Sequence, residues 1–210
     1  MKPYLIFDFD GTLVQSKELA IYVLNKLAVK YGGRTVNSDE IDDLSEMSIP
    51  DRMRVLNIPM YRLPALLIEG KKEYRKLAAE LQPVEGIISV LYFLKQKGYS
   101  LGLLSSNRQD VICPFLEVHQ LHVFDFVHSV TNLFGKHHAI AHVARKYHID
   151  LQDIRYVGDE LRDVQACNKI GVKMVAVTWG YDSAKLLKDA DHICHSPESL
   201  KQLVLNITEP

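Results

Sequence analysis

Two aspartates follow the first apolar run of the chain. Asp8 and Asp10 come directly after residues 4–7, and Gly11 follows the second acid. Such a run is typical of a strand that is covered on both faces, so the carboxylates would lie where the strand leaves the core. Residues two apart on a strand point the same way, although a turn at Gly11 can redirect Asp10. Two carboxylates at this position suit a hard cation and a reacting phosphoryl group, and the alternative is a solvated strand end or an Asx turn.

Three later apolar runs also end in polar residues. Each has the length and composition of a buried strand, so its polar residues would lie at a strand end, as Asp8 and Asp10 do. The runs and the residues after them are 99–104 with Ser105-Ser106-Asn107-Arg108, 124–130 with Gly135-Lys136 shortly after it, and 154–158 with Asp159-Glu160-Leu161-Arg162-Asp163.

In this order, the polar groups resemble the four motifs of the haloacid dehalogenase (HAD) superfamily. The motifs are an Asp-x-Asp-Gly-Thr, a strand-end Ser, a Lys, and a Gly-Asp-x-x-x-Asp, and their order and spacing cover the whole chain. Residues 177–181 are similar to the phosphoglycolate phosphatase branch, whose cap is inserted after the first motif.

The resemblance implies a reaction at Asp8 and Asp10. Asp8 would attack phosphorus and form an aspartyl-phosphate, which is covalent catalysis by a carboxylate. Asp10 would protonate the leaving oxygen and later take a proton from water, which requires a pKa raised by burial and by a nearby like charge. The resemblance also implies Mg²⁺ as cofactor, held by an Asp8 oxygen, the Asp10 backbone carbonyl and Asp159. Asp163 would support these ligands without binding the ion directly.

The remaining motif residues would bind the phosphoryl group. Lys136 would offset the negative charge and orient Asp8, and Ser105 would donate its hydroxyl to a phosphoryl oxygen. The residues expected around the phosphate are Gly11, Thr12, Ser105, Ser106 and Lys136.

Outside residues 15–82, strands alternate with helical patterns. Helices are predicted over 86–97, 136–147 and 160–170, and further strands over 173–178 and near 192–195. This alternation predicts an α/β fold with a Rossmann-like parallel sheet that has helices on both faces. Ligands bind at the carboxyl ends of such strands, which is where all four motifs fall.

Residues 16–82 contain helical patterns and no convincing strand, and Ser48 and Asp51 form the capping pattern of one short helix. We therefore predict a catalytic core of residues 1–15 and 83–210 with an inserted helical cap of residues 16–82. The cap is either a lid or a helical subdomain that does not move. Arg52 is a candidate substrate contact, and a solvated helix arginine is the alternative.

Composition excludes several classes of protein. The formal net charge is −1, so no overall field attracts nucleic acid. Three widely spaced cysteines form neither a disulfide framework nor a zinc motif. No apolar run is long enough to span a bilayer, so we expect a cytoplasmic protein with no membrane partner. Whether it is a monomer or a homodimer stays open.

The sequence thus predicts a Mg²⁺-dependent phosphatase of a small phosphorylated metabolite, with phosphoglycolate as the leading candidate by resemblance. A dehalogenase would share the nucleophile but would not need an acid at position 10, and a sugar-phosphate mutase would use the same intermediate. A catalytically silent binding module is the alternative from a different class, and it would be natural only if the motif residues had been lost.

Overall fold

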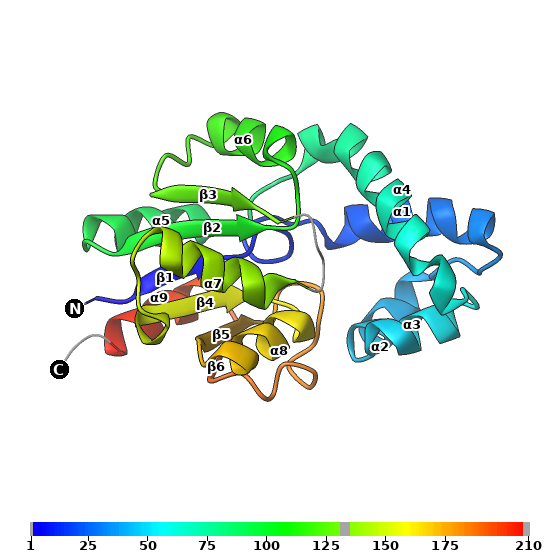
Figure 1. The fold of residues 1–210 in the computed structure, drawn as a ribbon. Helices are drawn as coiled ribbons and strands as arrows, with labels where there is room; N and C mark the ends of the chain where they lie inside the picture. Colours follow the sequence, from blue (N-terminus) through cyan, green and yellow to red (C-terminus); the bar gives the residue numbers. More distant parts are fainter. Residues whose placement is uncertain (1, 131–134, 208–210) are drawn as a thin grey trace.

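A computed structural model describes residues 2–130 and 135–207 of the chain. Within them, six strands form one sheet in the order β3-β2-β1-β4-β5-β6, and every neighbouring pair is parallel (Figure 1). This confirms the predicted α/β fold. The strands are β1 (Tyr4–Phe7), β2 (Ser100–Ser105), β3 (Phe126–Ser129), β4 (Ile154–Gly158), β5 (Lys173–Val177) and β6 (His192–Cys194).

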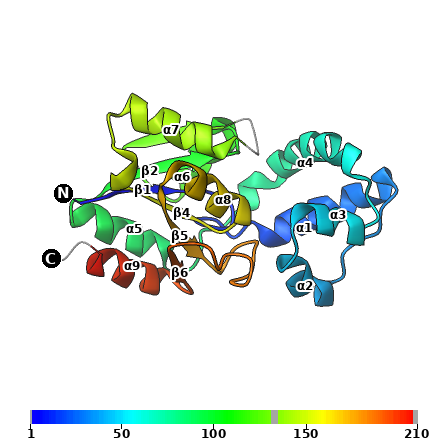
Figure 2. The same cartoon turned by 60° about the horizontal axis from the view of Figure 1, so that its bottom comes forward.

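Side chains of the central strands alternate between two apolar cores, one on each face of the sheet. On β1, Leu5 and Phe7 pack into one core and Ile6 into the other. The first core also contains residues of α5 (Ile87–Gln96), α6 (Gln109–Val118) and α9 (Pro197–Asn206). The second contains residues of α7 (Lys136–Lys146) and α8 (Leu161–Ile170). Both faces are therefore covered by helices (Figure 2), which explains why the strand sequences are almost continuously apolar.

The regular structure of residues 16–82 is entirely helical. Its α-helices are α1 (Lys17–Ala28), α2 (Ile41–Ser45), α3 (Ile49–Val55) and α4 (Leu63–Leu77), and they extend away from the sheet (Figure 1). Ser48 caps α3 and accepts a hydrogen bond from the Asp51 backbone N–H, as the sequence pattern predicts. We refer to residues 16–82 as the helical segment.

The two ends of the helical segment lie side by side. The Gln15 backbone N–H donates to the Gln82 carbonyl at 2.9 Å, and Val84 donates to Leu13 at the same distance. The chain thus leaves the sheet and returns to it through two short hydrogen-bonded segments, which form one antiparallel bridge between Val14 and Pro83. That the segment forms a separate cap stays a prediction.

The sheet order places the polar motifs together. The chain runs from β1 outward to β3 and then crosses back to β4, so β1 and β4 are neighbours at the point where the strand order reverses. Crevices form at this point, outside the carboxyl ends of the strands. Asp8 follows β1 and Asp159 follows β4. Within the described part of the chain, no helix combines the length and apolar character needed to cross a membrane.

Candidate active site

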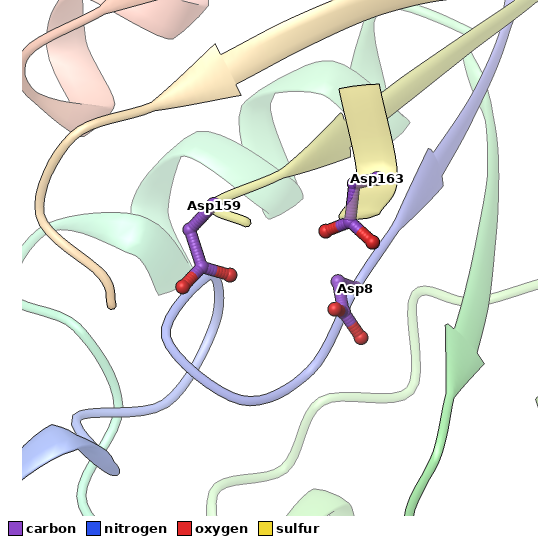
Figure 3. A group of neighbouring side chains, drawn as sticks. All are labelled: Asp8, Asp159 and Asp163. Atoms are coloured by element: carbon purple, nitrogen blue, oxygen red, sulfur yellow. The ribbon is translucent and has the colours of Figure 1, made fainter. Parts of the chain in front are cut away.

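Three buried carboxylates meet at the ends of β1 and β4. Asp8, Asp159 and Asp163 each offer an oxygen, and these oxygens all lie within 4.8 Å of one another (Figure 3). Asp163 joins the group because α8 begins just after β4, so that its first turn faces the end of β1. The structure thus brings together three residues that are up to 155 positions apart in the sequence.

The Asp159 carboxylate is held in a narrow space. Its oxygens accept hydrogen bonds from the Thr12 hydroxyl and from the Tyr181 backbone N–H, both at 2.8 Å. A Cβ atom at Gly11 or at Gly180 would collide with this carboxylate. Gly11 also has a φ of 70°, so the turn after Asp10 requires glycine on two separate grounds.

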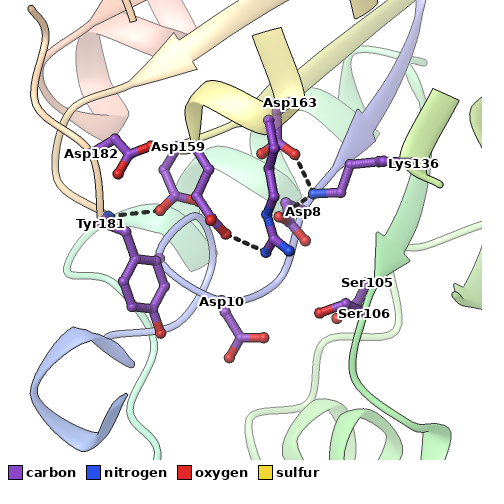
Figure 4. A network of polar contacts seen from close by, with 12 residues as sticks. Asp8, Asp10, Ser105, Ser106, Lys136, Asp159, Asp163, Tyr181 and Asp182 are labelled. Atoms are coloured by element: carbon purple, nitrogen blue, oxygen red, sulfur yellow. Dashed lines mark hydrogen bonds and ion pairs between the residues drawn. The ribbon is translucent and has the colours of Figure 1, made fainter. Parts of the chain in front are cut away.

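The carboxylate cluster fits a hard divalent cation. Burial raises the pKa of Asp159 well above its usual range, and the neighbouring carboxylates, Glu160 and Asp8 foremost, raise it further. A bound cation would relieve this repulsion, and an all-oxygen donor set suits Mg²⁺ or Ca²⁺ better than zinc. The Asp10 side chain points away from the cluster (Figure 4). A metal contact by Asp10 would therefore use its backbone carbonyl, as the sequence reading proposed.

Lys136 connects two members of the cluster. It is the first residue of α7 and is 4% exposed, and its Nζ donates a 2.6 Å hydrogen bond to Asp8 and forms an ion pair with Asp163 (Figure 4). Burial alone would lower the pKa of this lysine, but the carboxylates of Asp163 and Asp8 outweigh that effect and raise it. Lys136 is therefore a permanent cation beside Asp8.

Asp10 has different surroundings from Asp8. One of its carboxylate oxygens accepts a hydrogen bond from the Tyr74 hydroxyl, and the other accepts one from the Asn107 side chain at 2.6 Å. Burial raises the pKa of Asp10 to about 6; the Tyr74 hydrogen bond opposes this shift, and the charge of Asp8 adds to it. Asp10 consequently titrates near neutral pH, which suits a group that both gives and takes a proton.

The strand-end serines lie at the end of β2, across the site from Asp159 (Figure 4). Ser105 is fully buried, and its hydroxyl accepts a hydrogen bond from the Asn107 backbone N–H at 3.0 Å. Ser106 is partly exposed, and its carbonyl accepts a 3.0 Å hydrogen bond from Lys71 of α4. The same short loop therefore contacts the helical segment and holds the hydroxyl next to the reaction site.

A cavity of about 280 Å³ lies between the helical segment and the carboxyl edge of the sheet. Its polar end includes Asp10, Ser106 and Asn107, and its other end is lined by apolar residues of α1 and α4 such as Leu24 and Leu67. Asp10 is thus the member of the first motif that faces the cavity, while Asp8 lies in the buried cluster beneath it.

Arg52 also lines this cavity, but its guanidinium is already engaged. It forms an ion pair with Asp182 and donates a 2.7 Å hydrogen bond to the Leu44 carbonyl. Asp182 in turn accepts a 2.7 Å hydrogen bond from the backbone N–H of Leu161, at the start of α8. Arg52 therefore links the helical segment to the core, and its contact with a substrate stays a prediction.

Four residues of the site received no role from the sequence. Asn107 stands in the polar run that follows β2, and Arg162 stands between the two acids of the last motif, so both positions carried a signal. The other two are Tyr74 and Lys71 of α4, which belong to an ordinary amphipathic pattern in the sequence. Only the packing of α4 shows that they reach the cavity.

The family model for haloacid dehalogenase-like hydrolases matches residues 5–177 of this chain. A phosphoglycolate phosphatase from Synechococcus elongatus is 30% identical over 206 residues, which cover 97% of each protein. A second phosphoglycolate phosphatase, from Agrobacterium fabrum, is 26% identical and covers 90% of this chain and 85% of its own length.

Solved structures share the fold. A predicted phosphatase from Clostridium acetobutylicum matches 98% of this chain and 99% of its own with a TM-score of 0.81 and 22% identity. A haloacid dehalogenase-like family hydrolase from Streptococcus pneumoniae matches 96% of this chain and 98% of its own with a TM-score of 0.77 and 20% identity. At these identities the structural likeness concerns the fold alone.

Proposed function

The chain belongs to the haloacid dehalogenase-like hydrolase family, and from this premise we propose that it is a Mg²⁺-dependent phosphatase of a small phosphomonoester. One observation carries the proposal, namely the contrast between two acids of the same motif. Asp8 is ion-paired with Lys136, whereas burial raises the pKa of Asp10 to about 6. Two carboxylates with such different surroundings suit different roles, Asp8 as the nucleophile and Asp10 as the general acid.

The reaction has two steps. In the first, an Asp8 oxygen forms a bond to phosphorus, the bond from phosphorus to the alcohol oxygen breaks, and Asp10 gives its proton to that oxygen. In the second, a water molecule attacks the aspartyl-phosphate, Asp10 takes a proton from it, and Asp8 and inorganic phosphate are released. A dehalogenase would not need the acid at Asp10, so the surroundings of Asp10 support the phosphatase reading.

The surroundings of Asp8 stabilise the charge that develops on the phosphoryl group. Ser105 accepts from the Asn107 backbone N–H, so its own proton can be donated to a phosphoryl oxygen. Asp8, Asp159 and the Asp10 carbonyl would hold Mg²⁺, with Asp163 beside them. The cation would neutralise phosphoryl oxygens and fix their orientation toward Asp8.

Phosphoglycolate is the leading candidate for the substrate. Two relatives that cover nearly the whole chain are named for this activity. The cavity of about 280 Å³ also suits a small ester better than a phosphoprotein.

The test is a phosphate-release screen over a panel of small phosphate esters, with and without Mg²⁺. We expect Mg²⁺-dependent turnover by the wild-type protein and none by Asp8→Asn, which keeps the size of the side chain but removes the nucleophile. Circular dichroism would confirm that the variant is folded. Near wild-type turnover by purified Asp8→Asn would contradict the mechanism, and no turnover of any ester by the metal-loaded wild type would contradict the function.

A further inference from the structure

Arg162 has an unusual environment for an arginine in the first turn of a helix. Its side chain is only 15% exposed, and one terminal nitrogen of the guanidinium forms an ion pair with Glu160. The other two nitrogens, Nε and Nη1, are enclosed and have no hydrogen-bond partner among the described residues. Arg162 is thus a nearly buried cation, and most of its N–H donors have no acceptor among the described residues.

Unused donors on a buried charged group are costly. A hydrogen bond to a charged group is worth roughly 1.5–3 kcal/mol, and a buried donor without a partner loses its hydration in addition. Native structures therefore leave few such groups, and those that remain need an explanation. A ligand that accepts from Nε and Nη1 would remove the cost.

The position of Arg162 indicates what kind of ligand this is. It lines the same cavity as Asp10. Burial alone would lower the pKa of Arg162, but the nearby carboxylates of Glu160, Asp163 and Asp8 outweigh that effect and raise it. Neither Asp163 nor Asp8 forms an ion pair with it among the described residues, in contrast to Glu160. The guanidinium therefore lies beside the nucleophile without being neutralised by it.

Lys136 has at most one donor left for this role. An ammonium group has three donors, and the Nζ of Lys136 already contacts Asp8 and Asp163. A phosphomonoester brings further negative charge into a site that already holds several carboxylates. A guanidinium carries five N–H donors in fixed directions, so it can serve Glu160 and a phosphoryl oxygen together, and it stays charged at any working pH.

We propose that Arg162, oriented by Glu160, binds the phosphoryl group of the substrate through its unused N–H donors. Glu160 engages Nη2 of the guanidinium, so Nε and Nη1 are the nitrogens left for another acceptor. The proposal rests on the proposed phosphatase function and adds to it a phosphate-binding residue from the last motif.

The test measures binding of inorganic phosphate, the product, to the Mg²⁺-loaded protein by isothermal titration calorimetry. Arg162→Ala should weaken phosphate binding by roughly 10- to 100-fold, since it removes hydrogen bonds between charged groups. Arg162→Lys keeps the charge but loses the fixed N–H donors of the guanidinium, so its affinity for phosphate should fall between those of Arg162→Ala and the wild type. Arg145→Ala, which removes an exposed arginine from the last turn of α7, is the matched control and should bind as the wild type does.

A second variant covers the case in which Arg162→Ala leaves Glu160 buried without its partner and fails to fold. The double variant Glu160→Gln with Arg162→Met removes both charges, and it should show the same loss of phosphate binding. The proposal is overturned if a folded variant without Arg162 binds phosphate with a Kd within twofold of that of the wild type. It is also overturned if the variant changes in its affinity for Mg²⁺ alone. Because this readout does not require turnover, failure of the phosphatase function in the ester screen is a separate result.

Discussion

Tyr74 of α4 donates its hydroxyl to the carboxylate of Asp10, 64 positions earlier in the chain. The bond joins the helical segment to the proposed general acid, and it is shielded because Tyr74 is 8% exposed. It favours the charged form of Asp10 and so opposes the rise in pKa that burial causes. The helical segment therefore takes part in setting the protonation of a core residue.

Tyr74→Phe should raise the pKa of Asp10, because the hydrogen bond that lowers it is lost while the burial remains. The first step needs protonated Asp10, so the fall of kcat/KM at rising pH should move to higher pH in the variant. The measurement is a pH profile of kcat/KM with a generic aryl phosphate at saturating Mg²⁺. Tyr22→Phe, which changes an exposed tyrosine of α1, should leave the profile in place. A Tyr74→Phe profile that coincides with that of the wild type would contradict the link.

Asp10→Asn should slow turnover by about 10²- to 10⁴-fold, the usual worth of a general acid, and should stabilise the fold at neutral pH. Burial raises the pKa of Asp10 from its ordinary 3.8 to about 6, so folding favours protonated Asp10. The resulting penalty is absent below about pH 4, grows as pH rises, and is complete above about pH 6. Because asparagine loses one of the two acceptor contacts, we expect a net gain of about 1–2 kcal/mol.

The measurement for Asp10→Asn is the free energy of unfolding by urea in metal-free buffer, for the variant and the wild type, between pH 4 and pH 8. The advantage of the variant should increase from pH 4 to a little above pH 6 and then level off. If the difference in the free energy of unfolding is the same at all pH values, the charge of Asp10 does not destabilise the fold.

Mg²⁺ should stabilise metal-stripped protein against heat, because it would bind the Asp8, Asp159 and Asp163 cluster only when the chain is folded. At a concentration 100 times its Kd, the gain is about 2.7 kcal/mol. Chelator should remove activity and Mg²⁺ should restore it, whereas Ca²⁺ should inhibit because its coordination is looser. Asp159→Asn should abolish the Mg²⁺-dependent rise in Tm, and Asp189→Asn, at an exposed acid, should keep it. Full activity in protein shown by elemental analysis to be metal-free would exclude the cation role.

Lys71→Ala should change the ranking of substrates. Lys71 of α4 lines the cavity and donates one hydrogen bond, to the Ser106 carbonyl, whereas Arg52 is engaged by Asp182 and the Leu44 carbonyl. A second anionic group on the substrate would therefore meet Lys71 more readily. We expect kcat/KM to fall more for phosphoglycolate than for an aryl phosphate without that group.

The matched control for Lys71→Ala is Lys72→Ala, which removes the neighbouring exposed lysine. Arg52→Ala tests the contact that the sequence suggested, and it should lower stability through the lost ion pair as well as affect activity. If every ester falls by the same factor in Lys71→Ala, this residue does not choose the substrate.

The fold was predictable because its signals are local. Apolar runs followed by polar residues mark strand ends, and the parallel sheet then brings Asp8 and Asp159 together whatever the intervening sequence. Element ends differ from the predicted ones by one or two residues: the strand predicted over 124–130, for example, is Phe126–Ser129. Such differences of one or two residues are usual at the ends of helices and strands.

The contacts of the helical segment were not predictable in the same way. Tyr74 of α4 meets Asp10 through a tertiary contact across 64 positions, and no spacing in the sequence encodes that contact. Arg162 was visible between two motif acids, but the sequence does not indicate whether its side chain turns toward solvent or into the cavity. Both depend on long-range packing, which residue patterns describe poorly.

The hydrogen-bonded pairing of Gln15 with Gln82 and of Val84 with Leu13 has a consequence for how such proteins diversify. The chain leaves and re-enters the sheet at neighbouring residues, so the insertion is a closed loop. The entropy cost of closing such a loop grows only slowly with its length. A whole set of helices can therefore be lengthened, replaced or exchanged without moving Asp8, Lys136 or Asp159. We therefore expect that an exchange of residues 16–82 would alter the cavity lining while the carboxylate cluster keeps its geometry.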